Sequence, residues 1–294
     1  MRPISGSTRL AGVVGTPLAH SLSPAMHNAA YEHMELDWVY VPFDVSDEVG
    51  LRRLVAAVRS LDFVGFNVTM PYKQAMLELC DEVAAAASMA GAVNTVHCVD
   101  GRLVGYNTDG RGLLEALELE CDFVPADKDV VVVGAGGAAG AALVALILGR
   151  ARSVTVVARE ISRGQELVER MSEHAGSVTL RARDLASAGE LVSAAQLVVN
   201  ATPRGMRAGD PSPLNTDWLR SGQVVYDMVY GTPIPTALVR AGEAAGAKTA
   251  DGLGMLVCQG ATAVDIWLGE GTAAPRDVMR AAAKAALDTR RATG

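Results

Sequence analysis

Two residues with acid–base chemistry stand out in polar segments of the N-terminal part of the chain. Lys73 follows an apolar run that ends in Asn67 and Thr69, and Pro71 predicts that a helix begins just before it. In a first turn, the helix dipole disfavours the positive charge of a lysine and eases proton release. Asp109 is predicted to begin another helix, whose positive end favours an ionised carboxylate. Each is a candidate for acid–base chemistry; a solvated lysine and an ordinary first-turn acid are the alternatives.

Residues 15–28 supply hydroxyl groups after a predicted strand. Ser21 and Ser23 lie where a loop leads into a helix, so their hydroxyls could bind a polyol or a carboxylate. Ser23, followed by a proline, is also the predicted N-cap of that helix, and the two roles are compatible. We interpret His20 and His27 as structural residues rather than ligands.

A glycine-rich turn lies between a β-branched run, residues 130–133, and a strong helix former, residues 138–148. It fits the pattern G-x-G-x-x-A, in which the first glycine permits a tight turn and the second lets the backbone approach a pyrophosphate. The small third residue allows helix and strand to pack closely, and the helix N-terminus faces the phosphate charge. The strand–turn–helix context favours dinucleotide binding over a simple packing turn. The turn consists of Gly134, Ala135, Gly136, Gly137, Ala138 and Ala139.

The residues after the next predicted strand bear on the type of dinucleotide. NAD sites usually carry an acid there for the ribose hydroxyls. Here Arg159 and Arg163 can clamp a 2′-phosphate, since guanidinium groups pair well with phosphate oxygens. The sequence therefore predicts NADP. Glu160 would repel that phosphate unless it points away, and two solvated arginines are the plain alternative, so NAD stays open.

The pattern of the N-terminal part predicts strands that alternate with helices. A hairpin is expected at 92–106, because Asp100-Gly101 suits a type I′ turn. Thr108 is the predicted N-cap of the helix that Asp109 begins. The other strands are expected at 10–14, 38–42 and 63–68, and the helices at 23–33, 49–60, 71–86 and 109–120.

In the C-terminal part, short buried strands alternate with helices, which predicts a doubly wound parallel sheet. The strands are expected at 130–133, 154–158, 178–182, 197–200 and 224–226. A helix at 254–268 and a last alanine-rich helix after Pro275 follow. The fold class is therefore α/β with two domains, an N-terminal α/β domain and a Rossmann-like domain.

Composition restricts the class of protein. At about 150 residues per domain, 294 residues suggest two domains. A hydrophobic share of 50% with only 20% charged residues excludes disorder, and a net charge of −7 argues against a nucleic-acid partner. The cysteines, Cys80, Cys98, Cys121 and Cys258, lack metal-site spacing, so we expect reduced thiols and no metal. Residues 1–10 show no apolar run typical of a signal peptide, and we expect a cytoplasmic protein.

One uncharged stretch of 20 residues, 130–149, is long enough to span a bilayer and contains Gly136 and Gly140 at G-x-x-x-G spacing. Its β-branched start, glycine-rich turn and alanine-rich end instead predict a buried strand, turn and helix. No membrane association is therefore expected.

Together the polar segments resemble the shikimate dehydrogenase family, and the resemblance runs along nearly the whole chain. Eight motifs occur in the order of the family, which makes a chance match implausible. They are the segment 15–28, NVTMPYK at 67–73, AGAVNT at 90–95, NTDG at 107–110, the glycine-rich turn, NATPRGM at 200–206, DMVY at 227–230 and DGLGMLVCQ at 251–259.

The resemblance implies a reaction and a domain organisation. The family reduces 3-dehydroshikimate to shikimate with NADPH, reversibly, in aromatic amino-acid biosynthesis. A substrate-binding and catalytic domain would comprise residues 1–108 plus 252–294, with a C-terminal helical return, and an NADP-binding domain would comprise 109–251. The partner would be this small-molecule substrate, and the protein a monomer or a homodimer.

The resemblance also implies roles for single residues by motif position. Lys73 and Asp109 would be the catalytic pair, and Met255 would lie near the nicotinamide. The substrate would be bound by Ser21, Ser23, Asn67, Thr69, Asn94, Tyr230 and Gln259. Beside the glycine-rich turn, Arg159 and Arg163, the cofactor would contact Asn200, Ala201, Thr202, Met228, Gly252 and Met255.

Two departures from the family pattern are present. The usual Asn-Arg-Thr of the cofactor clamp is Ala158-Arg159-Glu160 here, which removes two polar partners of NADP. After Tyr230 the family usually has Asn-Pro, whereas this chain has the loop 231–236 with Pro233 and Pro235, so a different loop shape is expected.

Three other functions are compatible with parts of this pattern. A quinate or quinate/shikimate dehydrogenase using NAD is the nearest, because quinate adds only one hydroxyl beside the carboxylate; the pair Ser21 and Ser23 resembles the shikimate form. An aminoshikimate-type relative is a further option. A regulator that binds NADP without catalysis would need neither Lys73 nor Asp109, and this chain has both.

Overall fold

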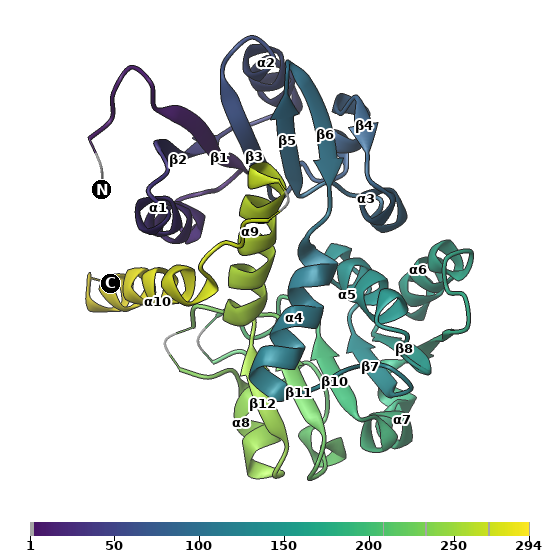
Figure 1. Cartoon of the computed structure of the whole chain (residues 1–294). Coiled ribbons are helices and arrows are strands. Elements are labelled where there is room, and N and C mark those ends of the chain that lie inside the picture. The colour runs from purple at the N-terminus through teal and green to yellow at the C-terminus, as the bar shows by residue number, and fades with distance from the viewer. Residues whose placement is uncertain (1–2, 208, 233, 270, 294) are drawn as a thin grey trace. The chain divides into compact units, whose positions relative to one another are not determined.

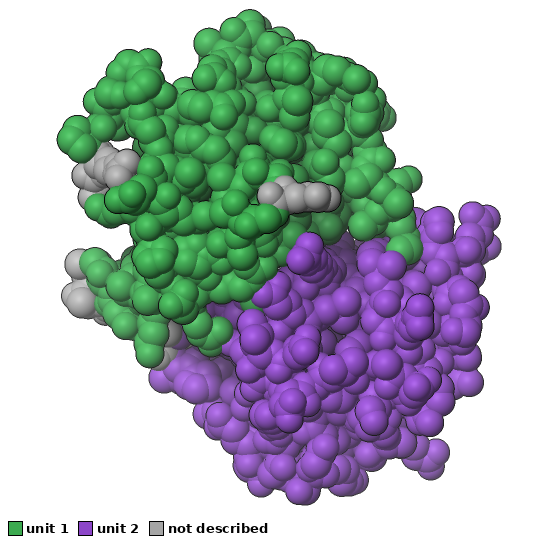
Figure 2. Space-filling model, in the orientation of Figure 1, with its two compact units in different colours: residues 1–108, 257–294 green, residues 109–256 purple. Residues whose placement is uncertain are grey.

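The structure, a computed structural model, describes residues 3–207, 209–232, 234–269 and 271–293 (Figure 1). Two compact units make up the chain (Figure 2). Unit 1 comprises the described residues within Met1–Thr108 and Val257–Gly294, and unit 2 those within Asp109–Leu256. The expected return at residue 252 falls just before helix α9 (Leu253–Leu268), whereas the second segment of unit 1 begins inside this helix, at Val257.

Unit 1 contains a mixed sheet in the order β2-β1-β3-β5-β6-β4 (Figure 1). Strand β1 lies parallel to β2 on one side and to β3 on the other, with Val14 opposite Val68, while β5 runs antiparallel to β3 and to β6. Since β1 and β3 end at the same edge, the loops that follow them are neighbours. The strands are β1 (Arg9–Gly15), β2 (Trp38–Asp44), β3 (Phe63–Val68), β4 (Glu82–Val83), β5 (Thr95–Val99) and β6 (Arg102–Tyr106).

Apolar helix faces complete the core of unit 1. The Asp47 carboxylate accepts a hydrogen bond from the backbone N–H of Gly50 and caps α2, which buries Leu51 and Val55 against the sheet. Trp267 of α9 donates from Nε1 to the carbonyl of Val96 at 2.9 Å. Helix α10 packs against α1. The helices are α1 (Ser23–His33), α2 (Glu48–Val58), η1 (Ala75–Leu79), α3 (Ala85–Ala90), the end of α9, and α10 (Arg276–Thr293).

The hairpin prediction is confirmed, because Asp100 and Gly101 have φ of 50° and 76°, as a type I′ turn requires. The N-cap prediction for α1 is wrong. Leu22 occupies that position without a side-chain bond, and Ser23 is the first helical residue.

The helix predicted at 71–86 is also wrong. A turn over residues 70–74 leads into the short η1, then into β4 and α3. Tertiary contacts override the local helix propensity here. The Tyr72 hydroxyl donates to the carbonyl of Val45 at 2.6 Å, and the backbone N–H of Leu103 donates to the Asp81 carboxylate at 2.7 Å. Lys73 is therefore not in the first turn of an α-helix, and the dipole argument made for it fails.

Unit 2 is built on a fully parallel sheet in the order β12-β11-β10-β7-β8-β9. The strand order reverses between β7 and β10, which is the doubly wound arrangement expected from the sequence. The prediction of the fold class is thus confirmed. The strands are β7 (Asp129–Val133), β8 (Ser153–Ala158), β9 (Thr179–Asp184), β10 (Leu197–Asn200), β11 (Val224–Asp227) and β12 (Lys248–Asp251).

Helices connect these strands, and the uncharged stretch of the sequence forms the centre of the unit. It comprises β7, the glycine-rich turn and α5, which is buried over most of its length because α4 packs on it. Within the described ranges, no helix is long and apolar enough to cross a membrane. The helices are α4 (Asp109–Cys121), α5 (Gly137–Leu148), α6 (Ile161–Ser172), η2 (Leu185–Ser187), α7 (Gly189–Ala194), η3 (Thr216–Trp218), α8 (Ala237–Ala244) and the start of α9.

Candidate functional site

A buried chain of polar side chains runs through unit 1. The Tyr40 hydroxyl donates to Oδ1 of Asn67 at 2.8 Å, and Nδ2 of Asn67 donates to Oγ1 of Thr95 at 3.0 Å. Thr95 in turn donates to Oδ1 of Asn94 at 3.0 Å. These four side chains are buried, so each bond lies in a medium where a lost partner is costly. This series of hydrogen bonds fixes the orientation of the side-chain amides of Asn67 and Asn94, two predicted substrate-binding residues.

Asn94 extends this chain to α9. Its Oδ1 accepts from the backbone N–H of Thr108 at 2.8 Å, and its Nδ2 donates to Oγ1 of Thr108 at 3.0 Å and to Oε1 of Gln259 at 3.3 Å. We call the side chains of Tyr40, Asn67, Thr95, Asn94, Thr108 and Gln259 the amide network. Three residues predicted separately as substrate ligands, Asn67, Asn94 and Gln259, are thus brought together.

The loop that carries Ser21 and Ser23 is held from both sides. Oγ of Ser21 accepts from the backbone N–H of Ser23 at 3.3 Å, and the Ser23 side chain hydrogen-bonds the Tyr40 hydroxyl. Arg290 of α10 donates to the carbonyls of His20 and Ser21 at 2.7 and 2.9 Å. Ser23 is buried and Ser21 is half-buried, so Ser21 is the more open of the two hydroxyls.

Thr69 and Lys73 lie in the loop after β3, next to the loop after β1. The backbone N–H of Thr69 donates to the carbonyl of Val14 at 2.8 Å. A Cβ on Gly15 would lie 2.3 Å from Cγ2 of Thr69, so only glycine permits this approach. The carbonyl of Lys73 accepts from Val93 at 2.8 Å, which ties the lysine backbone to the segment that leads to Asn94. Both predicted residues are half-buried at the edge of the sheet where the serine loop also lies.

His27 is a buried neighbour of the amide network. Its ring stacks on that of Tyr40 with centroids 4.1 Å apart, and burial lowers the pKa of His27 to about 3. Neither ring nitrogen has a hydrogen-bond partner among the described residues. Burial also raises the pKa of Tyr40 well above its usual range, so its hydroxyl stays protonated as a donor.

In unit 2 the glycine-rich turn lies where the strand order reverses. Gly134 has a φ of +118°, and a Cβ there would lie 3.0 Å from the carbonyl oxygen of Ala201. Gly136 is the N-cap of α5 and provides no side-chain cap for its backbone N–H groups. A Cβ on Gly136 or Gly137 would meet nothing within 4 Å. The turn therefore leaves space in front of a helix N-terminus, which suits a phosphate.

A groove of about 1010 Å³ lies at this edge of unit 2. Drug-sized ligands occupy pockets of about 300–1,000 Å³, so the groove is large enough for a dinucleotide. Of the predicted cofactor residues it is lined by Gly134, Ala135, Gly136, Arg159, Arg163, Ala201 and Thr202. The other predicted cofactor residues do not line the groove as the structure describes it: Gly137, Ala138, Ala139, Asn200, Met228, Gly252 and Met255.

Asn200 acts instead through its neighbours. Its Oδ1 accepts from the Thr202 hydroxyl at 2.7 Å, and its Nδ2 donates to the Asp227 carboxylate at 2.8 Å. Thr236 donates to the other oxygen of Asp227 at 2.6 Å, although burial still raises the pKa of Asp227. These bonds fix the loops that follow β10 and β11.

Met228 and Gly252 adjoin each other at the loop after β11. A Cβ on Gly252 would lie 2.2 Å from the carbonyl oxygen of Met228. Met255 is nearly buried, and its backbone N–H donates to the Tyr226 hydroxyl at 3.2 Å. Tyr230 is 37% exposed. The expected change of shape in loop 231–236 involves Pro233, which lies outside the described residues.

The two acid–base candidates belong to different units. Lys73 is in unit 1 and Asp109 in unit 2. The prediction that Asp109 begins a helix is confirmed, because it is the first residue of α4. Both side chains are half-buried.

The groove contains more charged residues than the two arginines predicted from the sequence. Oε2 of Glu160 lies 2.8 Å from Nε of Arg163, so the acid pairs with one clamp arginine. The loop after β10 adds Arg204 and Arg207, which sequence reasoning missed. The signal available was an arginine inside NATPRGM, a motif otherwise read only for its Asn, Ala and Thr.

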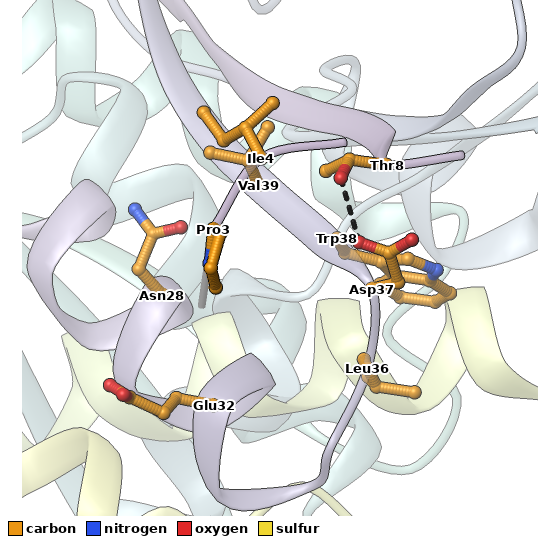
Figure 3. A pocket seen from close by; sticks show the side chains of 9 residues that line it. All are labelled: Pro3, Ile4, Thr8, Asn28, Glu32, Leu36, Asp37, Trp38 and Val39. Carbon is orange, nitrogen blue, oxygen red and sulfur yellow. Dashed lines mark hydrogen bonds between the residues drawn. The ribbon is translucent and has the colours of Figure 1, made fainter. Parts of the chain in front are cut away.

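A second hollow, in unit 1, is unsuited to an organic substrate. It measures about 20 Å³, room for about one water molecule, and lies beside the bond from Thr8 to Asp37, 2.7 Å long (Figure 3). In the described part of the chain, no group of three or more His, Cys, Asp or Glu could hold a metal ion.

Family models match three segments of the chain. They are the shikimate dehydrogenase substrate binding domain over residues 13–96, shikimate / quinate 5-dehydrogenase over 120–205, and the shikimate 5'-dehydrogenase C-terminal domain over 252–284.

Individual relatives agree with these matches. A shikimate dehydrogenase (NADP(+)) of Citrifermentans bemidjiense is 44% identical over 97% of this chain and 98% of its own. The crystal structure of shikimate 5-dehydrogenase from Thermus thermophilus in complex with NADP(H) and shikimate is 38% identical, with a TM-score of 0.83 over 95% of this chain and 99% of that one. Quinate dehydrogenase from Corynebacterium glutamicum in complex with NAD is 34% identical, with a TM-score of 0.86 over 94% and 98%. The predicted resemblance is confirmed, and the chain belongs to the shikimate dehydrogenase family.

Proposed function

We propose that this protein reduces 3-dehydroshikimate to shikimate with NADPH, reversibly, in the pathway to aromatic amino acids. The observation that carries the proposal is the groove of unit 2, where the open glycine-rich turn, the N-terminus of α5 and Arg159 line one space. Relatives named as NADP-dependent shikimate dehydrogenases match nearly the whole chain, which supports the same substrate and cofactor here.

The reduction of a ketone needs a hydride on carbon and a proton on oxygen. When bound, the nicotinamide supplies the hydride. The protein must orient the ketone and supply the proton. We assign the proton to the Lys73 ammonium, and to Asp109 the tasks of orienting that ammonium and binding the reacting hydroxyl. In the oxidation of shikimate the same groups accept the proton.

The substrate would be held at the edge of unit 1 where the loops after β1 and β3 meet. Ser21, Thr69 and Gln259 are half-buried there and present polar groups from three elements. Ser23, Asn67 and Asn94 are buried; the amide network orients the two amides, and Ser23 hydrogen-bonds its Tyr40 hydroxyl. Tyr230, the remaining assigned ligand, comes from the loop after β11.

We further propose that the protein acts in the cytoplasm, on a small-molecule substrate and without a metal. The structure has no disulfide among its four cysteines, which supports action in a reducing cytoplasm. Its partner is the small-molecule substrate, and its reaction requires no metal.

Identification of the product tests the proposal. NADPH and 3-dehydroshikimate would be incubated with the purified protein, and the product would be identified by proton NMR. Shikimate formed in proportion to NADPH consumed is the expected result. Cofactor consumption with a different product, or none, would refute the assignment of the substrate.

A further inference from the structure

We propose that Arg204 and Arg207, on the loop after β10, form a second basic wall of the cofactor groove and select the dinucleotide that carries a 2′-phosphate. The inference rests on the proposed function only in that the groove holds a dinucleotide. It names two specificity residues outside the predicted clamp of Arg159 and Arg163.

One arginine of the predicted clamp in the groove is already paired with an acid. Glu160 lies 2.8 Å from Arg163, so this carboxylate neutralises one arginine of the predicted clamp. A phosphate there would have to displace Glu160 or accept its repulsion. Arg159 alone would bind a 2′-phosphate more weakly than two arginines would, and the methyl side chain of Ala158 adds no hydrogen bond to the phosphate.

Arg204 and Arg207 are in a different situation. Within the described ranges, neither guanidinium makes a hydrogen bond or an ion pair, although both line the groove. Asp210 is the acid beside them; hydrogen bonds from the backbone N–H groups of Arg207 and Gly205 lower its pKa most, and the charges of the two arginines add to this. Its carboxylate, however, already accepts from the backbone N–H groups of Gly205 and Arg207 at 3.1 and 3.2 Å. Both guanidinium groups therefore remain available to an anion.

The backbone of Arg204 is held firmly at the edge of the sheet. Its N–H donates to Oγ1 of Thr202 at 3.2 Å, and its carbonyl accepts from Nδ2 of Asn200 at 3.1 Å. Gly205 follows with a φ of +106°, and a Cβ there would lie 3.0 Å from the Thr236 side chain. The fixed backbone keeps this side chain at the groove, and its planar guanidinium can pair with two phosphate oxygens.

Arg204 and Arg207 differ in solvent exposure. Arg204 is half-buried, whereas Arg207 is exposed, so water screens the charge of Arg207 more strongly. We therefore expect Arg204 to contribute more to selectivity than Arg207.

Calorimetric titration with adenosine 2′,5′-bisphosphate and with 5′-AMP isolates the added phosphate from the nicotinamide and from catalysis. For Arg204→Ala, the dissociation constant of the bisphosphate should rise about tenfold, while that of 5′-AMP changes less than about twofold. Arg207→Ala should raise the dissociation constant of the bisphosphate by only a few-fold. Glu160→Gln should lower the dissociation constant of the bisphosphate, because Arg163 then no longer pairs with a carboxylate. Arg181→Ala removes an exposed arginine of β9 outside the groove and serves as the charge-matched control.

Equal weakening of both nucleotides by Arg204→Ala would overturn the proposal, since the arginine would then hold a part common to both. An unchanged bisphosphate affinity in Arg204→Ala and Arg207→Ala would overturn it as well. Thermal unfolding midpoints that match the wild type would show that each variant is folded. If the wild-type protein binds neither nucleotide, the proposed function fails at its first step, which differs from either result above.

Discussion

In unit 1 the polar groups at the carboxyl edge of the sheet are held by other side chains, whereas in unit 2 the groove is formed largely by the backbone. The amide network of unit 1 runs from Tyr40 to Gln259 through hydrogen bonds that are buried up to Asn94 and partly buried at Gln259. In unit 2, the turn at Gly134 and the start of α5 create the space, and arginines on two loops add charge. A small polyol requires fixed side-chain donors and acceptors, and a pyrophosphate requires close-lying N–H groups.

The contrast predicts different sensitivities. In a largely buried hydrogen-bonded network, the loss of one partner should affect several of the proposed substrate-binding residues. A groove built from backbone should respond mainly to added atoms that block the approach of the ligand.

Removal of the proposed proton donor should have the largest effect. Lys73→Ala should lower kcat for shikimate oxidation by about 10²- to 10⁴-fold, while the KM for shikimate changes far less. Steady-state kinetics at saturating cofactor measure both constants. Lys284→Ala, an exposed lysine of α10, is the matched control and should retain full activity. Near-normal turnover in Lys73→Ala would remove this residue from the mechanism.

Two glycines of the turn should separate folding from cofactor binding. Gly134→Ala forces a side chain into φ of +118° against Ala201, so the free energy of unfolding should fall by about 1–3 kcal/mol. Gly136→Ala adds a methyl group where nothing lies within 4 Å, so stability should hold while NADPH binding weakens by about tenfold or more. Chemical denaturation and calorimetry measure the two effects. Unchanged NADPH affinity in Gly136→Ala would mean that the turn does not approach the cofactor.

Loss of one buried hydroxyl should weaken substrate binding from a distance. Tyr40→Phe removes the bonds to Asn67 and Ser23, so the KM for shikimate should rise about tenfold while the KM for NADP stays unchanged. Ser193→Ala removes a hydroxyl of unit 2 outside the amide network, which donates to the Trp218 carbonyl at 2.9 Å, and should lower stability without changing either KM. Equal KM values for shikimate in the two variants would show that the amide network does not orient the substrate ligands.

The smallest effect expected is a pH dependence of stability from His27. Its pKa is about 3 in the folded protein and about 6.5 when unfolded, so between these values the unfolded chain binds more protons. The contribution of His27 is fully present above pH 6.5 and falls by about 1.4 kcal/mol per pH unit below it. Denaturation at pH 7.5 and 5.5 compares the wild type with His27→Phe, which keeps a ring among Tyr31, Tyr40 and Trp267. The same acid-induced loss in both proteins would contradict this assignment.

The contrast between the units also explains what could be predicted from the sequence. The central strands of unit 2, β7, β8, β10 and β11, are rich in β-branched residues and buried on both faces, so a short apolar run such as residues 197–200 locates β10 without further information. The edge strand β12, with the polar sequence KTAD, carries no such signal and was missed. The glycine-rich turn follows from local rules that hold in many proteins.

Unit 1 was less predictable because its structure depends on distant contacts. Residues 71–86 have helix-forming side chains, yet Tyr72 and Asp81 bind to Val45 and Leu103 and prevent a helix. The polar residues Asn67 and Asn94 were identified by family motifs, whereas the role of Tyr40 was not, because a tyrosine in a strand is a common core residue. Arg204 and the pairing of Glu160 with Arg163 likewise depend on which side chains share the groove.

The most direct measurement of the central claim is the absorbance of the reduced cofactor with purified protein, crossing shikimate and quinate with NADP and NAD. Rapid reduction of NADP with shikimate, and much slower turnover in the other three combinations, is the predicted result. Preferred turnover of quinate, or a preference for NAD, would contradict it and would assign this chain the activity of an NAD-linked quinate dehydrogenase.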